Sequence, residues 1–195
     1  LVYSNEGKEL ISEKEALDKI SSKKQLYEGV VITGGEPTLR TDLEDILQQI
    51  KEKIGLPVKL DTNGTNPKFL KQLLEKQLID YVAVDIKTSL EKYPLVIADK
   101  EKASELIANV EETVVFLKDS NYFYEFRSTV YPPFFQDDDL PLIAKTIKGA
   151  NRYLLQQYNP ENTLDTKCTK DVFSSVKLEE LRSYFSEHVT NCEIR

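Results

Sequence analysis

The sequence predicts an α/β protein in which parallel strands alternate with helices. Three observations lead to this prediction. Short apolar, β-branched runs recur along the chain, amphipathic helical patterns separate them, and the runs end in polar residues or glycine. Parallel strands need crossover connections, and the crossover helices then cover the sheet. We therefore expect either an open doubly wound sheet or a complete or partial barrel.

Composition narrows the class of protein further. With 195 residues and 40% hydrophobic content, the chain can bury one core of ordinary size, so we expect a single domain, 1–195. The net charge is −7 and lysines are interspersed with acids, which argues against a nucleic-acid partner. No apolar run approaches the roughly 18 residues needed to span a bilayer, and the start shows no secretory leader pattern. We expect a cytoplasmic protein without a membrane partner.

In the first part of the chain, helix-start signals precede three amphipathic segments. Ser12 with Glu15 forms a capping box, and Thr41 with Glu44 repeats it. Pro67, directly after an asparagine, suits the first turn of a third helix. The expected helices are 13–21, 41–55 and 66–78, and the expected strands are 29–33, 58–61 and 81–86.

The same alternation continues to the end of the chain. Apolar residues at helical spacing alternate with short apolar runs, and no repeat or low-complexity linker interrupts them. About five parallel strands result, with 191–194 as a short edge strand. The expected helices are 103–117, 140–147 and 178–185, and the further expected strands are 122–130 and 151–157.

Polar residues and glycine gather where the expected strands end. In barrels and in open sheets alike, ligands bind at the carboxyl ends of parallel strands, because the following loops converge there. The sequence therefore predicts one ligand site at this rim. The segments concerned are 34–36 (GGE), 61–64 (DTNG), 85–87 (DIK), Arg127 at the end of its strand, and 156–158 (QQY).

Two aspartates at this rim are expected to need a cation. Residues two apart on a strand share a face, so Asp61 with Asn63, and Asp85 with Lys87, should each point the same way. Neighbouring strands would bring Asp61 and Asp85 close together, and like charges repel unless a monovalent cation or Lys87 relieves them. The alternative is that the aspartates cap loops and Lys87 reaches solvent.

The glycine pair at 34–35 has two interpretations. Without Cβ atoms, Gly34 and Gly35 let a ligand's polar group lie against the main chain. A pair of glycines after a strand can also form an ordinary tight turn. A phosphate-binding enzyme is disfavoured, since neither a glycine-rich fingerprint nor a lysine-serine pair follows the strand.

Three motifs together, 33–39 (TGGEPTL), 61–65 (DTNGT) and 80–87 (DYVAVDIK), resemble the radical S-adenosylmethionine (SAM) superfamily. The similarity is to activating proteins of glycyl-radical enzymes, in particular of anaerobic ribonucleoside-triphosphate reductase and of pyruvate formate-lyase. It implies a partial (β/α)6 TIM-like barrel that binds SAM and a 4Fe–4S cluster. It also implies formation of a 5′-deoxyadenosyl radical, which takes a hydrogen atom from a glycine of the partner enzyme.

The resemblance assigns roles to individual positions. The residues implied for SAM are Gly34, Gly35 and Glu36 at its ammonium group, Lys87 at its carboxylate, Asn63 near the ribose, Arg127 at the cofactor, and Gln157 and Tyr158 near the adenosine. The residues implied for a monovalent cation are Asp61, Thr62, Asp85 and the carbonyl of Ala83. A one-electron donor such as flavodoxin or ferredoxin is implied as a second partner.

The departure from the family pattern concerns the cluster. The family holds it on three cysteines in a CxxxCxxC loop, and the 195 residues contain no such pattern. Cys168 and Cys192 are expected to be ordinary thiols, and residues 1–3 resemble the sequence that follows the cluster loop. We therefore expect the first strand and the cluster ligands upstream of Leu1, and no activity from these residues alone.

Two further functions stay open at this point. One is a radical SAM enzyme that acts on a small molecule, such as a 7-carboxy-7-deazaguanine synthase, in which a proline is expected between the acid and the lysine of the third motif. Asp85-Ile86-Lys87 favours the activating enzyme instead. The other is a non-catalytic remnant that binds the cofactor or a partner surface.

Overall fold

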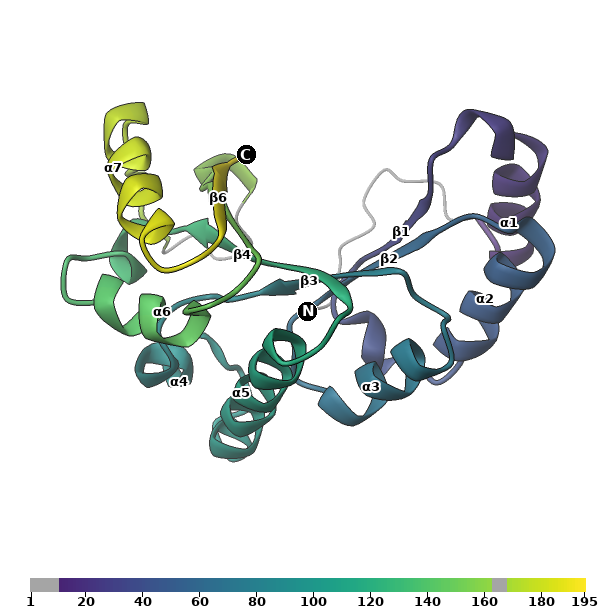
Figure 1. Cartoon of the computed structure of the whole chain (residues 1–195), viewed down its shortest axis with the longest axis horizontal. Coiled ribbons are helices and arrows are strands. Elements are labelled where there is room, and N and C mark those ends of the chain that lie inside the picture. Colours follow the sequence, from purple (N-terminus) through teal and green to yellow (C-terminus); the bar gives the residue numbers. More distant parts are fainter. Residues whose placement is uncertain (1–10, 163–167) are drawn as a thin grey trace. The chain divides into compact units, whose positions relative to one another are not determined.

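The computed structural model describes residues 11–162 and 168–195 (Figure 1). Within them, six strands follow the order β1 to β6 in one sheet, and the predicted α/β class is confirmed. Strand β3 (Tyr81–Asp85) begins in one compact unit and ends in another. The first unit consists of Leu1–Thr62 and Lys68–Val82, and the second consists of Asn63–Pro67 and Ala83–Arg195.

The first unit is built on two parallel strands, β1 (Val30–Ile32) and β2 (Val58–Thr62). Val30 aligns with Val58, and every second residue of β2 is buried, as a strand with one covered face requires. The helical segments of this part of the chain are α1 (Glu13–Ser22), η1 (Lys24–Leu26), η2 (Pro37–Leu39), α2 (Leu43–Gln49), the π-helix η3 (Ile50–Ile54) and α3 (Pro67–Glu75).

One of the two predicted capping boxes is present. The Ser12 hydroxyl accepts a hydrogen bond from the Glu15 backbone at 3.2 Å, and the Glu15 carboxylate accepts one from the Ser12 backbone at 2.8 Å. The predicted box of Thr41 and Glu44 is wrong. Helix α2 starts one residue later than this box requires, after Asp42, whose carboxylate accepts hydrogen bonds from Arg40 instead of capping the helix.

The second unit contains the remaining strands in parallel register. Strand β4 pairs with β5, and β5 pairs with β6. The predicted edge strand at 191–194 is confirmed as β6. The elements are η4 (Leu90–Lys92), α4 (Tyr93–Val96), α5 (Ala103–Lys118), β4 (Phe123–Val130), η5 (Pro132–Phe134), α6 (Leu140–Ile147), β5 (Arg152–Gln157), η6 (Pro160–Asn162), α7 (Ser175–Ser186) and β6 (Asn191–Ile194).

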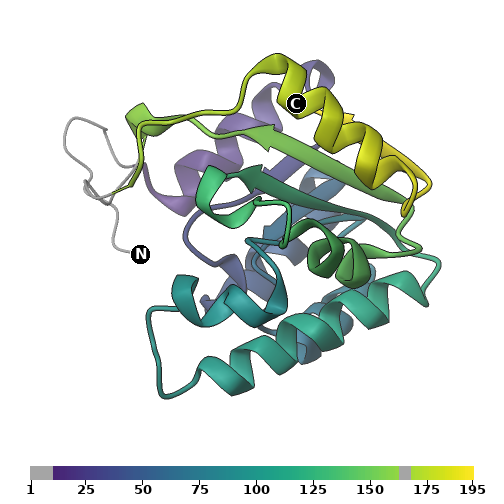
Figure 2. The same cartoon turned by 90° about the vertical axis from the view of Figure 1, so that its left-hand side faces the viewer.

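The core of the second unit lies between its strands and helices. Helix α5 contacts α4 and α6, and α7, yellow in Figure 2, packs against β5 and β6. Phe126, Tyr153 and Phe185 are fully buried there, and the last two rings meet edge to face at a centroid distance of 5.2 Å. On β4, Glu125, Arg127 and Thr129 share one face, and Tyr124, Phe126, Ser128 and Val130 share the other, which is buried.

None of the helices in the described part of the chain combines the length and the apolar character that a membrane crossing requires.

Candidate functional site

The loop after β1 is open and exposed, as the glycine pair predicts. Gly34 has a φ of +144°, a conformation that residues with a Cβ atom rarely adopt, and the space where its Cβ would stand is empty within 4 Å. Gly35 follows on the surface, and the loop lines a cavity of about 570 Å³. The main chain at this strand end is therefore accessible to a small ligand.

Glu36 is held firmly at the end of this loop. Its Oε1 atom accepts hydrogen bonds from the Thr38 backbone at 3.1 Å, the Thr38 hydroxyl at 2.6 Å and the Thr62 hydroxyl at 2.8 Å. The first contact caps η2, and the last joins the loop after β1 to the end of β2. The structure therefore brings Glu36 and Thr62 together and fixes the orientation of the carboxylate.

Asp61 precedes Thr62 on β2 and faces the half-exposed side of the strand. Only 12% of its side chain is exposed, and Lys59, two residues earlier on the same side, lies 3.9 Å from its Oδ1 atom. The positively charged ammonium group of Lys59 thus lies near the Asp61 carboxylate. The expected approach of Asp61 to Asp85, and the cation site that the two would share with Thr62 and the Ala83 carbonyl, stay predictions.

The loop after β2 is tied down by side chains. Asn63 Oδ1 accepts hydrogen bonds from the backbone and the hydroxyl of Thr65 at 2.9 and 2.7 Å, an Asx turn. Gly64 has a φ of +77°, and a Cβ there would approach a Val84 methyl group at 3.0 Å. From α5, the Thr113 hydroxyl donates to the Gly64 carbonyl at 2.7 Å and Asn109 to the Thr65 carbonyl at 3.0 Å. These contacts fix the backbone around Asn63.

Replacing Thr113 with valine is expected to lower the free energy of unfolding by about 1 kcal/mol. Thr113 is fully buried, and valine keeps its shape but removes the hydrogen bond to the buried Gly64 carbonyl. Urea denaturation measures the loss, with Thr129→Val, at an exposed threonine of β4, as the control. Equal stability of both variants would show that the hydroxyl does not hold the loop.

Charged side chains meet near the carboxyl end of β3 and the middle of β4. Asp85, Lys87 and Arg127 form this charged cluster. Lys87 Nζ lies 2.7 Å from Asp85 Oδ2, and the Arg127 guanidinium donates from Nε to Asp85 Oδ1. The expected alignment of Asp85 and Lys87 is therefore confirmed, and Lys87, one of the two predicted neutralising partners, contacts Asp85. The Asp85 carboxylate therefore contacts two cationic side chains. Lys87 is 45% exposed, whereas Arg127 is only 14% exposed.

The pKa of the Asp85 carboxyl reflects this arrangement. Burial alone would raise its pKa, but the charges and hydrogen bonds of Lys87 and Arg127 outweigh burial and lower the pKa below its ordinary value. Asp85 is consequently ionised throughout the neutral range.

Arg127 does not stand at the end of its strand. Strand β4 continues to Val130, so the prediction of its place in the strand is wrong, although its side chain reaches the strand-end carboxylate of Asp85. Residues 128–130 continue the pairing with β5, in which Arg127 aligns with Leu154 and Val130 with Gln157. The side chain of Arg127 therefore reaches Asp85 from the middle of β4 and not from its end.

Gln157 is the last residue of β5, and Tyr158 follows it directly. The Tyr158 ring meets Tyr131 edge to face at 5.0 Å, and its hydroxyl donates to the Thr169 carbonyl at 3.0 Å. Gln157 is exposed, and its amide lies 3.5 Å from the Phe173 carbonyl. Their expected contact with the adenosine stays a prediction.

Sequence reasoning missed the side chains that support the site. Thr113 and Asn109 on α5 hold the loop after β2, and Tyr93 on α4 hydrogen-bonds the backbone around Asp85 and Lys87. No local motif marks these positions. Only the polar character of Thr113 on an otherwise apolar helix face could have indicated a buried hydrogen bond.

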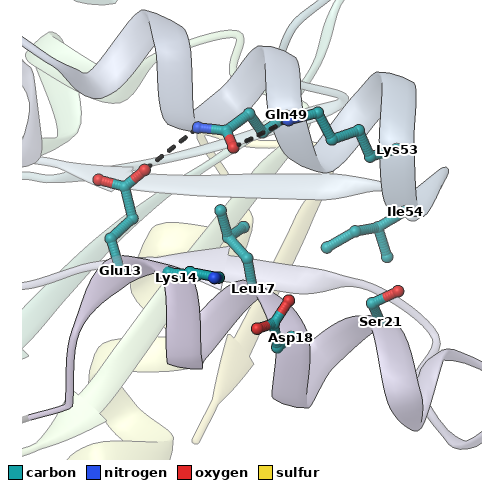
Figure 3. A pocket seen from close by; sticks show the side chains of 8 residues that line it. All are labelled: Glu13, Lys14, Leu17, Asp18, Ser21, Gln49, Lys53 and Ile54. Carbon is teal, nitrogen blue, oxygen red and sulfur yellow. Dashed lines mark hydrogen bonds between the residues drawn. The ribbon is translucent and has the colours of Figure 1, made fainter.

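A second cavity in the first unit is lined by none of the predicted site residues. It measures about 400 Å³ and lies between α1 and the segment formed by α2 and η3 (Figure 3). Glu13 accepts a hydrogen bond from Gln49 there, and Gln49 accepts one from Lys53. These contacts pair the lining residues with one another, and the lining contains no residue of the three motifs.

The cysteines do not form a metal site. Cys192 is buried, which raises the pKa of its thiol to about 11, so the thiolate that metals bind is scarce at neutral pH. Within 11–162 and 168–195, no group of three or more His, Cys, Asp or Glu side chains could hold a metal ion. The residues 1–3 that resemble the sequence after a cluster loop lie outside the described residues. The residues present therefore do not fit an iron–sulfur cluster.

Known proteins resemble this chain in sequence and in fold. The sequence profile of the Radical SAM superfamily matches residues 3–147. A protein of Methanocaldococcus jannaschii that is named as a glycyl-radical enzyme activating enzyme is 36% identical over 170 residues, which cover 86% of this chain and 70% of that protein. A second protein of this organism with the same kind of name is 28% identical over 139 residues, covering 69% and 52%.

A solved structure shares the fold. The crystal structure of a domain of pyruvate-formate lyase-activating enzyme from Bacteroides vulgatus superposes with a TM-score of 0.66 at 16% identity, covering 87% of this chain and 99% of that domain. The predicted α/β fold of the radical SAM type is thereby confirmed. The matched profile spans well over half of the chain, and the first relative is similar over most of its own length. This chain belongs to the radical SAM superfamily.

Proposed function

We propose that this protein is the activating enzyme of a glycyl-radical enzyme, with anaerobic ribonucleoside-triphosphate reductase as the favoured partner and a pyruvate formate-lyase-like enzyme as the next. The observation that carries the proposal is the 36% identity, over 86% of the chain, to a protein named as such an activating enzyme. The uninterrupted Asp85-Ile86-Lys87 motif supports it against a deazaguanine-type synthase, in which a proline is expected between acid and lysine.

Members of the superfamily use SAM and a 4Fe–4S cluster. Because the described residues do not fit the cluster, we assign it no ligand and no step here. For the amino-acid end of SAM, the proposed ligands follow from the resemblance. The cationic side chain of Lys87 suits a carboxylate, and the fixed carboxylate of Glu36 suits an ammonium group.

Lys87 is the proposed ligand of the methionine carboxylate. Its ammonium group has three N–H donors, and the 2.7 Å contact with Asp85 uses one of them. Arg127 would hold the Asp85 carboxylate, and Asp85 would hold the lysine in place while the remaining N–H donors bind the ligand. Gly34, Gly35 and Glu36 would bind the ammonium group, and when bound, SAM supplies the 5′-deoxyadenosyl group that receives the hydrogen atom.

The remaining assignments rest on the resemblance. Asn63 is proposed to lie near the ribose. The Asx turn and the two hydrogen bonds from α5 fix the backbone around Asn63. Gln157 and Tyr158 are proposed near the adenosine. The proposed monovalent-cation site is formed by Asp61, Thr62, Asp85 and the carbonyl of Ala83, since oxygen ligands of these types suit such an ion.

The function is tested by electron paramagnetic resonance. The complete polypeptide with its cluster, SAM and a one-electron reductant such as reduced flavodoxin is mixed without oxygen with candidate glycyl-radical enzymes. The expected result is a glycyl radical signal on the anaerobic reductase that disappears when SAM is omitted. A reduced, SAM-binding protein that yields no such signal on either class of partner would overturn the activating function and favour a small-molecule substrate.

A further inference from the structure

The tyrosine at the start of α4 touches the backbone on both sides of Ile86. Tyr93 is 3% exposed, and its hydroxyl accepts a hydrogen bond from the Lys87 N–H at 3.1 Å. The same hydroxyl donates to the Asp85 carbonyl at 3.4 Å. We propose that Tyr93 is a positioning residue that sets Lys87 for cofactor binding through the backbone. This inference rests on the role of Lys87 in the proposed function.

The backbone that Tyr93 holds lies where the strand pairing of β3 ends. The Ile86 N–H donates to the Arg127 carbonyl at 2.8 Å, and the Ile86 carbonyl accepts from the Ser128 hydroxyl at 2.5 Å. Tyr93 contacts the groups directly before and after, which are the Asp85 carbonyl and the Lys87 N–H. Four successive backbone groups are thus fixed, two of them by β4 and two by one phenol hydroxyl.

The position of the phenol is itself well defined. Tyr93 follows η4, and the last residue of η4, Lys92, places its Nζ atom 2.6 Å from the buried Asp139 at the start of α6. Asp139 also accepts a hydrogen bond from the Gln136 backbone at 3.0 Å. Helix α4 further contacts α5. The segment that carries the phenol is therefore attached to two helices, independently of the charged cluster.

The hydroxyl also keeps its proton under all ordinary conditions. Burial raises the pKa of Tyr93, and the nearby Asp85 charge raises it further, although the bond from Lys87 acts in the opposite direction. A neutral phenol can donate to the Asp85 carbonyl and accept from the Lys87 N–H at once. Removing the phenol oxygen would remove the hydrogen bonds to the Lys87 N–H and the Asp85 carbonyl, so the backbone at Lys87 could shift.

A double-mutant cycle tests the inference. SAM dissociation constants are measured by calorimetry, in the absence of oxygen, on the complete polypeptide and its Tyr93→Phe, Lys87→Ala and double variants. We expect Tyr93→Phe to weaken binding about tenfold, which corresponds to about 1.4 kcal/mol. In the Lys87→Ala background, Tyr93→Phe should cause no further loss, because a residue that acts through Lys87 has nothing left to position.

Tyr124→Phe is the matched control. Tyr124 is also buried, at 4% exposure, and its hydroxyl accepts a hydrogen bond from the Asn151 backbone at 3.3 Å, away from the motif. The Tyr124→Phe variant should alter SAM affinity less than about twofold. Its melting temperature should fall by about as much as that of Tyr93→Phe, because each variant loses one buried hydroxyl. A purely structural hydroxyl would give equal affinity changes in the two phenylalanine variants, which would overturn the positioning role.

Two other outcomes separate this inference from the proposed function. Additive losses in the cycle, or unchanged affinity in Lys87→Ala, would overturn the positioning of Lys87 by Tyr93, whatever the partner enzyme is. A missing glycyl radical, combined with the expected cycle in SAM binding, would confirm the role of Tyr93 and overturn only the activating function.

Discussion

Replacing Asp85 with alanine is expected to lower the free energy of unfolding by about 2 kcal/mol at neutral pH. The change removes the contact between the Asp85 carboxylate and the Arg127 guanidinium, which is only 14% exposed. A fully buried pair would lose more, but Asp85 is 25% exposed and solvent screens part of the charge. Urea denaturation followed by circular dichroism measures the difference.

A second aspartate–arginine pair provides the control. Arg40 donates to both oxygens of Asp42 at 2.9 and 2.7 Å, but the two side chains are 56% and 49% exposed. Asp42→Ala removes the same chemical pair in solvent, so it should change stability little. If both alanine variants unfold at the same urea concentration as the wild type, the cluster on β3 and β4 does not stabilise the fold.

The pH dependence of this contribution has a definite sign. The pKa of Asp85 is lower in the folded state than its ordinary value of 3.8, so the unfolded chain takes up the proton first as the pH falls. The stabilisation is thus fully present above pH 3.8 and is lost as the pH drops through the lowered pKa. The stability difference between wild type and Asp85→Asn should be constant in the neutral range and shrink below that value. A difference that grew on acidification would contradict the lowered pKa.

The sequence was sufficient to find the strand ends and the charges on them. Apolar β-branched runs such as 81–86 indicate strands on their own, and the polar residues directly after them are visible in the same stretch. The pairing of Asp85 with Lys87 follows from the two-residue period of a strand. The contact of Arg127 with Asp85 was not predicted, because it depends on how two strands more than forty residues apart align.

The errors and omissions have a common physical cause. Thr41 and Glu44 have the spacing of a capping box. In the structure, however, Asp42 is the N-cap residue of α2, and its carboxylate binds Arg40. Spacing alone does not determine which of two neighbouring residues is the N-cap. Likewise, Tyr93 and Thr113 look like ordinary core residues. The Thr113 hydroxyl bonds a loop 49 residues away, and the Tyr93 hydroxyl bonds the backbone six and eight residues before it; the packing of α5 and α4 determines these partners, and no local motif does.

Lys87→Ala is expected to weaken SAM binding by about 10-fold to 100-fold. A charge-assisted hydrogen bond contributes about 1.5–3 kcal/mol, and each 1.4 kcal/mol corresponds to a factor of ten in affinity. The same change should alter stability little, because Lys87 is 45% exposed and Arg127 still neutralises Asp85. Calorimetric titration with SAM and urea denaturation of the same preparation measure both quantities.

The controls for this substitution separate local from general charge effects. Lys102→Ala removes a lysine that is 66% exposed and lies 3.8 Å from Asp99, so it should leave SAM affinity unchanged. Lys87→Arg keeps the charge and should restore part of the affinity, although its planar group fits the position of an ammonium less well. Unchanged affinity in Lys87→Ala would mean that the lysine only neutralises Asp85. If Lys87→Ala loses SAM binding but not stability, the residues of the cluster have different roles. Asp85 and Arg127 then stabilise the strands, and Lys87 binds SAM.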